Sequence, residues 1–337
     1  MIGKIIKIGL CGAALLILVG CSSGSPSGWA GPKESPSKAA WIVYWDLETG
    51  GADLTKIGHR LEKLSWFAAY FDAQDRLFVP AELTQKRQEA AKGPAMYLTI
   101  VNDKINANGS VAVKDLDVLN RLFASDESME RHIEEIIRLA LDGGYHGIEV
   151  DYERIWRDPT LGLSFTAFTN RLHVEARKNN LKLRIVLEPN APFDSPYFAA
   201  GPEYVVMLYN LHGLHNGPGP KADRAFIQKT VKRMKALPGD KAVALATGGV
   251  IWAENRGKKM VTQEEARSLA AKNGAEMKRD RDSQCLVFTY HDQGIKHTVW
   301  YADVHTLNFW IAAAQEQGEI PISLWRLGGN RDLQLLN

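Results

Sequence analysis

The stretch YHGIEVDYER, residues 145–154, alternates apolar and acidic side chains. Successive side chains of a β-strand point to opposite faces, so a strand here would place Glu149, Asp151 and Glu153 together on one face. A strand whose acids face solvent would make them ordinary surface residues. The other face of this stretch is formed by Ile, Val and Tyr, which indicates packing against helices. We therefore expect the three carboxylates to point inward.

The segments around this stretch predict a parallel sheet with helices between its strands. Residues 125–144, just before it, have acids in the first turn, an apolar stripe at helical spacing and a Gly-Gly end. Near-continuous apolar strands that alternate with such helices are typical of a sheet buried on both faces. Seven further apolar runs recur: WIVYWD at 41–46, LSWFAAYFD at 64–72, AMYLTIV at 95–101, LKLRIVLE at 181–188, EYVVMLYN at 203–210, KAVALAT at 241–247 and IPISLWR at 320–326.

Eight strands alternating with helices over about 300 residues suit an α/β fold of the (β/α)₈ TIM-barrel type. A doubly wound open sheet is the alternative layout. Residues 284–303, just before the last helix, are predicted to form a β-hairpin with its turn at Asp292-Gln293-Gly294. We expect this hairpin to be a small insertion and expect no second domain. Further helices are predicted at 84–92, 163–180, 223–237, 262–274 and 303–318.

Residues 1–20 are predicted to be a signal peptide. Lys4 and Lys7 precede an apolar run that is too short to span a bilayer comfortably. The run ends in LVGC, which resembles the lipobox of bacterial lipoproteins, in which the cysteine, here Cys21, becomes the acylated first residue. We therefore expect an exported protein, lipid-anchored in the bacterial cell envelope, either facing the periplasm or in the outer membrane. A signal cut elsewhere, or an uncleaved anchor, is the alternative.

The rest of the chain divides into a tether and one folded domain. Residues 21–39 are rich in Ser, Gly and Pro and are predicted to be a flexible tether, which leaves 40–337 for the catalytic barrel. The formal net charge of +2 falls to zero when the two lysines of residues 1–20 are removed. A neutral balance argues against nucleic acid as a partner. Cys285 is then the single cysteine of the domain, which excludes an internal disulfide and favours a core residue.

The inward carboxylates suggest chemistry at one end of the barrel. On the fourth of eight strands they would climb toward the carboxyl-terminal rim, where barrel enzymes keep their active sites. Like charges crowded in a poorly solvated site raise a pKa, so the last acid, Glu153, could stay protonated as a general acid. A site for a hard cation is the other chemical reading of a carboxylate row. The only histidine beside the row, His146, lies on the opposite face, so no metal and no cofactor is predicted.

Four segments of the sequence resemble one family of enzymes. GIEVDYE resembles the signature strand of family 18 glycoside hydrolases, Asp-x-x-Asp-x-Asp-x-Glu, above all in the YaaH-like and SleL-like N-acetylglucosaminidases of spore cortex and cell wall. YLTIVND and VVMLYN resemble the third-strand segment and the Met-x-Tyr-Asp strand of that branch. Residues 297–329, which end in Trp-Arg-Leu-Gly-Gly, resemble its closing hairpin, helix and eighth strand. The resemblance covers most of residues 40–330.

The resemblance implies a role for five side chains. Glu153 would protonate the glycosidic oxygen. Asp151 would orient the acetamido group of the substrate, whose carbonyl oxygen attacks the anomeric carbon to give an oxazolinium intermediate. Glu149 would sit behind Asp151 and share its proton. Tyr209 would hydrogen-bond the acetamido carbonyl, and Trp325 would form the apolar floor under the sugar.

Three positions depart from the family pattern. His146 replaces the first Asp, Glu149 replaces the second Asp, and Asn210 replaces the Asp of Met-x-Tyr-Asp, where it would contact substrate without supplying charge. The last two are the basis for an alternative, a catalytically inactive, lectin-like carbohydrate-binding barrel. An envelope scaffold lipoprotein is a third possibility.

Further residues are candidates for substrate binding. Sugar rings stack on indoles, and Trp45, Trp252 and Trp325 fall at or just beyond the ends of predicted strands one, seven and eight. Core packing is the alternative role for any one tryptophan. Glu188 ends the fifth strand and would either line the cleft or make a structural bond. The loop at 210–220 is expected to bound the substrate rather than to hold a metal.

The sequence therefore predicts a glycosidase that cleaves β-linked N-acetylglucosamine polymers by substrate-assisted, retaining catalysis. Peptidoglycan is favoured over chitin because the resemblance is to the cell-wall branch. The predicted partners are this polysaccharide and, through the N-terminal lipid, a membrane. We expect a monomer without a cofactor.

Overall fold

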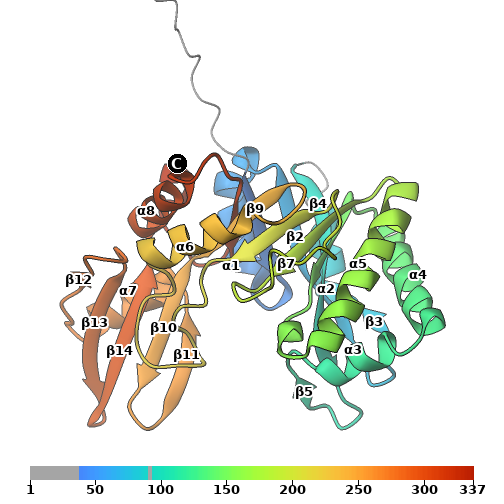
Figure 1. The fold of residues 1–337 in the computed structure, drawn as a ribbon. Coiled ribbons are helices and arrows are strands. Elements are labelled where there is room, and N and C mark those ends of the chain that lie inside the picture. The colour runs from blue at the N-terminus through green and yellow to red at the C-terminus, as the bar shows by residue number, and fades with distance from the viewer. Residues whose placement is uncertain (1–37, 90–92) are drawn as a thin grey trace, which may run out of the picture. The chain divides into compact units, whose positions relative to one another are not determined.

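The computed structural model describes residues 38–89 and 93–337. The predicted signal peptide, nearly all of the tether and the lipidation residue Cys21 lie outside these ranges. Eight strands of the described chain form a closed parallel barrel (Figure 1), in which the last strand pairs with the first, Lys38 lying opposite Ile322. The strands are β1 (Lys38–Val43), β2 (Lys63–Phe71), β4 (Ala95–Ile105), β6 (Gly147–Asp151), β7 (Lys182–Leu187), β8 (Glu203–Met207), β9 (Lys241–Ala246) and β15 (Ile322–Trp325).

This closure confirms the (β/α)₈ prediction and excludes the open sheet. All eight predicted apolar runs form barrel strands. The stretch around the carboxylates becomes β6, which ends at Asp151, so Glu153 follows the strand rather than closing it. Short antiparallel strands β3 (Leu77–Phe78) and β5 (Val111–Ala112) extend β2 and β4 at their carboxyl ends.

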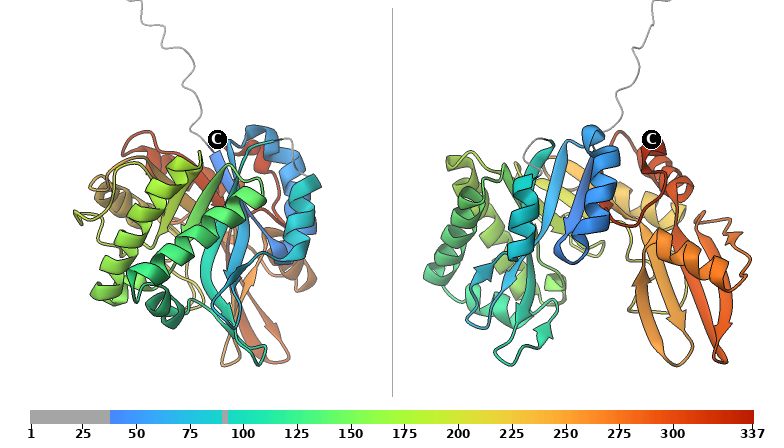
Figure 2. Two further views of the ribbon diagram at one scale, coloured as in Figure 1. Left: turned by 90° about the vertical axis from the view of Figure 1, so that its right-hand side faces the viewer. Right: turned by 180° about the vertical axis from the view of Figure 1, so that it is seen from behind.

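Helices cover the outside of the barrel in both views of Figure 2. α4 begins where Ser125 caps it with a capping box, and α5 begins behind Asp158, whose side chain accepts from Thr160 and Leu161. The helices outside the insertion are α1 (Leu47–Ile57), α2 (Ala81–Glu89), α3 (Leu116–Leu122), α4 (Asp126–Asp142), α5 (Pro159–Lys178), α6 (Arg224–Met234) and α8 (Val304–Gln315). Single 3₁₀ turns lie at Tyr44–Asp46, Gly58–Arg60, Ile155–Arg157 and Leu333–Leu335.

The hairpin predicted at 284–303 is present but belongs to a larger insertion. It forms β13 (Leu286–Asp292) and β14 (Ile295–Ala302), in a five-stranded antiparallel sheet with β10 (Gly248–Ala253), β11 (Gly257–Val261) and β12 (Lys278–Arg279). α7 (Gln263–Lys272), predicted among the barrel helices, packs instead on this sheet. The sheet, orange in Figure 1, extends from one side of the barrel. The prediction of a small hairpin insertion is therefore wrong in size.

A close approach of two strands explains the composition of β10. A side chain at Gly249 would place its Cβ 1.9 Å from the carbonyl oxygen of Trp300 on β14, so only glycine fits there. The insertion has its own small core, which includes Val261, Phe288 and Val299. None of the helices within residues 38–89 and 93–337 combines the length and apolar composition that crossing a membrane requires.

Candidate active site

The carboxyl ends of the barrel strands surround a cavity of about 240 Å³. It collects residues from the carboxyl ends of β6, β8 and β15, so the fourth, sixth and eighth barrel strands converge on it. Six predicted site residues line it: Trp45, Asp151, Glu153, Tyr209, Asn210 and Trp325. Five residues that the sequence analysis did not select complete the lining: Phe67, Val101, Asn102, Asp103 and Lys114.

The main chain of Glu153 is fixed by a neighbouring asparagine. Its N–H donates to Oδ1 of Asn102 at 2.9 Å, and its carbonyl accepts from Nδ2 of Asn102 at 3.2 Å. Arg154 then adopts a left-handed conformation with φ of 66°, and its N–H donates to Oε2 of Glu188 at 2.8 Å. Of the two roles considered for Glu188, the structure contains the structural bond, and Glu188 does not line the cavity.

The carboxyl groups of Asp151 and Glu153, at and just beyond the end of β6, differ from ordinary surface acids. Burial, followed by the charges of Glu153 and Glu149, raises the pKa of Asp151 well above its ordinary value. Burial also raises the pKa of Glu153, although the ammonium of Lys114, which pairs with Oε2 of Glu153, acts in the opposite direction. The expectation that crowding would retain a proton agrees with both directions.

Asp151 and Tyr209 present polar atoms to the cavity. Oδ1 of Asp151 is buried and accepts no hydrogen bond from any described residue, which is unusual for a buried oxygen. Burial and the neighbouring carboxylates, Asp151 first among them, raise the pKa of Tyr209 well above its ordinary value. Tyr209 therefore stays protonated at neutral pH and can donate a hydrogen bond. An unsatisfied acceptor and a hydroxyl donor suit a ligand that carries an amide.

Glu149 is connected to a different part of the barrel from the one expected. Its fully buried carboxylate accepts from the indole of Trp41, from Ser65 at 3.1 Å and from Thr99 at 2.8 Å, and it pairs with Nη1 of Arg184 at 2.5 Å. The partners of its carboxylate among the described residues are therefore Trp41, Ser65, Thr99 and Arg184 rather than Asp151. Arg184 supplies the positive charge that compensates the carboxylate of Glu149. The side chain of Glu149 is therefore paired inside the barrel.

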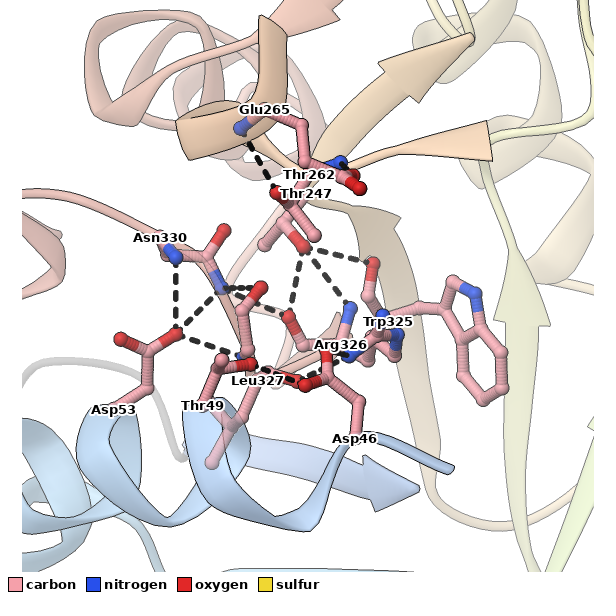
Figure 3. A network of polar contacts seen from close by, with 11 residues as sticks. Asp46, Thr49, Asp53, Thr247, Thr262, Glu265, Trp325, Arg326, Leu327 and Asn330 are labelled. Carbon is pink, nitrogen blue, oxygen red and sulfur yellow. Dashed lines mark hydrogen bonds and ion pairs between the residues drawn. The ribbon is translucent and has the colours of Figure 1, made fainter. Parts of the chain in front are cut away.

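Trp325 is held by a polar network shown in Figure 3. Its carbonyl accepts from the N–H of Thr247 at 2.7 Å, and the next residue, Arg326, pairs with Asp46 at 2.5 Å. The carbonyl of Arg326 accepts from the Thr247 hydroxyl at 2.8 Å and from the side chain of Asn330 at 3.0 Å. These bonds join the end of β15 to Thr247, just after β9, and to Asp46 in the 3₁₀ turn before α1, and they fix the chain that carries the indole.

Aromatic rings pack around the Trp325 indole. Its ring centroid lies 4.8 Å from that of Phe67 and 5.8 Å from that of Trp41, in edge-on arrangements. Trp45 is 53% exposed and meets Phe67 edge-on at 5.6 Å. Trp252 lies elsewhere: it is on β10 of the insertion, buried, with its indole N–H donating to the carbonyl of Asn216 at 3.0 Å. The structure therefore separates Trp252 from the cavity and from the end of the seventh strand.

The residues that were missed have unequal sequence signals. Asn102 and Asp103 end the YLTIVND segment and could have been selected from it. Lys114 lies in a loop with no pattern around it, and only the folded chain brings it to Glu153. A larger cavity, of about 910 Å³, opens among the starting ends of the strands, and none of the predicted site residues lines it. The described ranges hold no cluster of three or more His, Cys, Asp or Glu side chains arranged as a metal site.

Comparison with known proteins relates this arrangement to glycosidases. No protein-family model matches the chain. The chain is 23% identical over 243 residues to the uncharacterized glycosylase YvbX of Bacillus subtilis, covering 67% of this chain and 70% of that protein.

Two solved structures show the same fold. The spore cortex-lytic enzyme SleL of Bacillus cereus superimposes with a TM-score of 0.75 at 20% identity, covering 89% of this chain and 72% of that one. A chitinase of Chromobacterium violaceum gives a TM-score of 0.72 at 19% identity, covering 88% of this chain and 96% of that one. These comparisons show that the chain has the fold of SleL and of the chitinase, which is the fold that the resemblance to family 18 glycoside hydrolases implied.

Proposed function

We propose that the chain is a glycoside hydrolase that cleaves β-linked N-acetylglucosamine polymers, with peptidoglycan favoured over chitin. The observation that carries the proposal is that Asp151, Glu153, Tyr209 and Trp325 line the same cavity. Glycosidases with the same fold support the reaction class, and the similarity to the spore cortex-lytic enzyme SleL supports peptidoglycan as the substrate.

The proposed reaction uses the acetamido group of the substrate as nucleophile. The sugar ring would lie on Trp325. The acetamido N–H of the sugar would donate to the unsatisfied oxygen of Asp151, and the acetamido carbonyl would accept from the hydroxyl of Tyr209. The acetamido oxygen attacks the anomeric carbon while Glu153 gives its proton to the leaving oxygen. Asp151 stabilises the positive charge that develops on the acetamido group. Glu153 then takes a proton from a water molecule as that water attacks the anomeric carbon and opens the cyclic intermediate. The configuration at the anomeric carbon is thereby retained.

The decisive experiment is incubation of the purified protein with peptidoglycan and with N-acetylglucosamine oligomers, followed by mass spectrometry of the new reducing ends. Glu153→Gln is the matched control, since the amide keeps the shape of the side chain but cannot donate the proton. General acid catalysis typically contributes about 10²–10⁴-fold, so we expect turnover to fall by that factor while glycan binding persists. Equal turnover by both proteins would reject the mechanism.

A lectin-like barrel is the second candidate, and one contact favours it. The ammonium of Lys114 pairs with Glu153 and so favours the carboxylate over the acid form. If both the unaltered protein and Glu153→Gln bind glycan while neither yields new reducing ends, binding without hydrolysis is the function.

We also propose that Cys21 carries a lipid that anchors the protein in the cell envelope. β1 begins at Lys38, at the end of the barrel opposite the cavity, so the preceding residues join the domain away from the proposed site. Cys21→Ala should abolish incorporation of labelled fatty acid and move the protein from the membrane fraction to the soluble fraction. Membrane retention without label would instead indicate an uncleaved apolar segment.

A further inference from the structure

Lys114 is held beside the proposed acid by a loop that is hydrogen-bonded to β4. Lys114 lies just after β5 and has a φ of 57°. Its main-chain N–H donates to Oδ1 of Asp103 at 2.7 Å. The next residue, Asp115, donates its N–H to the carbonyl of Asn102 at 2.7 Å and caps α3 with its side chain. Asn102 is also the residue that fixes the main chain of Glu153. The lysine and the acid are therefore positioned by the same strand, β4.

The Lys114 side chain remains accessible although it is paired. It is 32% exposed, against 16% for Glu153, and both side chains line the cavity. Among the described residues that line the cavity, Lys114 alone is basic. The charges that act on Glu153, or on which it acts, include those of Asp103, Asp151, Glu188 and Tyr209, all of which are acids.

This pairing conflicts with the role of Glu153 unless something displaces it. A general acid must carry a proton at the moment of bond cleavage, whereas an adjacent ammonium favours the carboxylate. A neutral sugar offers the ammonium no anionic partner, because its hydroxyl and amide groups accept hydrogen bonds but carry no charge. A carboxylate on the substrate does offer one, as a charge-assisted hydrogen bond.

We propose that Lys114 binds a carboxylate carried by the sugar on the leaving side of the cleaved bond, and that this exchange of partners frees Glu153 to take up a proton from solvent. The inference rests on the proposed hydrolase function and specifies its substrate. Glu153 protonates the leaving oxygen, so its partner Lys114 lies on the leaving-group side.

The muramic acid of peptidoglycan provides such a carboxylate in the right place. Its lactyl group is an ether on the oxygen of C3, and the neighbouring carbon, C4, carries the oxygen of the β-1,4 linkage. The lactyl carboxylate therefore lies beside the leaving oxygen. That carboxylate is free only when no peptide is joined to it by an amide bond. The preferred substrate is therefore a peptide-free glycan strand, and the class of reaction that must supply it is amide hydrolysis between lactate and peptide.

The test compares three tetrasaccharides of equal length: a peptide-free strand of alternating N-acetylglucosamine and N-acetylmuramic acid, the same strand with its carboxylates converted to methylamides, and the N-acetylglucosamine tetramer. Steady-state kcat and KM are measured for the unaltered protein, Lys114→Met, Lys114→Arg and Lys229→Met. Lys229 is an exposed lysine on α6 outside the cavity lining and is the matched control.

We expect the unaltered protein to prefer the free carboxylate about ten- to hundredfold in kcat/KM, as a charge-assisted hydrogen bond typically provides. Lys114→Met should lose this preference, Lys114→Arg should keep most of it, and Lys229→Met should behave as the unaltered protein does. On the neutral tetramer, Lys114→Met should also move the basic limb of the pH profile to higher pH, because the charge that favours ionised Glu153 has gone.

Equal kcat/KM on all three tetrasaccharides by the unaltered protein would overturn the inference while leaving the hydrolase intact. So would an equal loss on all three in Lys114→Met, since that is the result of a structural role alone. Absence of cleavage of every substrate would instead reject the proposed hydrolase, and the inference with it. The comparison of substrates with the unaltered protein decides the matter even if Lys114→Met does not fold.

Discussion

Two buried carboxylates of β6 lie two residues apart and have opposite surroundings. Glu149, in the lower part of the barrel interior, pairs with Arg184, which in turn pairs with Glu203 at 2.9 Å. Asp151, at the rim, has no cation as its partner in the described structure and keeps one oxygen unsatisfied. A buried carboxylate thus contributes to stability in Glu149, which has a counter-charge. The same group is available for reaction in Asp151, which has none.

The lower layer provides the largest expected effect. Arg184→Met would leave the buried carboxylate of Glu149 without its counter-charge, and breaking a buried pair in this way costs about 3–5 kcal/mol. Urea unfolding should therefore show a loss of that size. The double variant Arg184→Met with Glu149→Gln should recover much of it, because the uncompensated charge is removed. No recovery in the double variant would mean that Arg184 acts through packing rather than through Glu149.

The contrast between the layers also shows what sequence can predict. Arg184 stands in the middle of the apolar run KLRIVL, and a charge in an otherwise buried strand is a signal for an inward ion pair. The alternation of residues 145–154 placed all three acids inward, but it contained no information on which acid would meet Arg184. That choice depends on the register of neighbouring strands, in which Glu149 lies opposite Arg184.

Other misses have similar physical causes. α1 was not predicted because it contains Gly50 and Gly51, which are poor helix formers. The structure explains Gly50, since a Cβ there would lie 2.9 Å from the side chain of Ile42 on β1. β10 follows β9 after one residue, and the sequence analysis did not predict it as a separate strand, so Trp252 was placed at or just beyond the end of the seventh strand. The eight barrel strands were predictable because burial on both faces makes them apolar throughout.

The rim layer provides the second prediction, in which activity and stability change in opposite directions. Asp151→Asn should lower kcat by about 10²–10³-fold, because an amide cannot stabilise the charge that develops on the acetamido group. The same variant should unfold at a higher temperature than the unaltered protein at neutral pH, since it removes a buried carboxyl whose ionisation is unfavourable.

The pH dependence of this gain follows from the sign of the pKa shift. The folded pKa of Asp151 is raised, so above the ordinary pKa of an aspartate the unfolded chain loses a proton that the folded chain retains. Stability of the unaltered protein therefore falls as pH rises through that window. Melting temperatures of the two proteins should coincide below the ordinary pKa and diverge as pH rises. A constant difference across pH would show that Asp151 does not carry the raised pKa.

The smallest effects separate two tryptophans that the sequence treated alike. Trp325→Ala should raise KM up to about tenfold, as expected when an aromatic contact worth about 0.5–1.5 kcal/mol is lost. Trp252→Phe should leave kcat and KM within twofold, because the indole lies in the insertion and not in the cavity lining. Trp252→Phe should instead lower the free energy of unfolding by about 0.5–1.5 kcal/mol, because the hydrogen bond to the carbonyl of Asn216 is lost. A change in KM for Trp252→Phe comparable to that for Trp325→Ala would show that bound glycan extends from the barrel rim onto the insertion sheet.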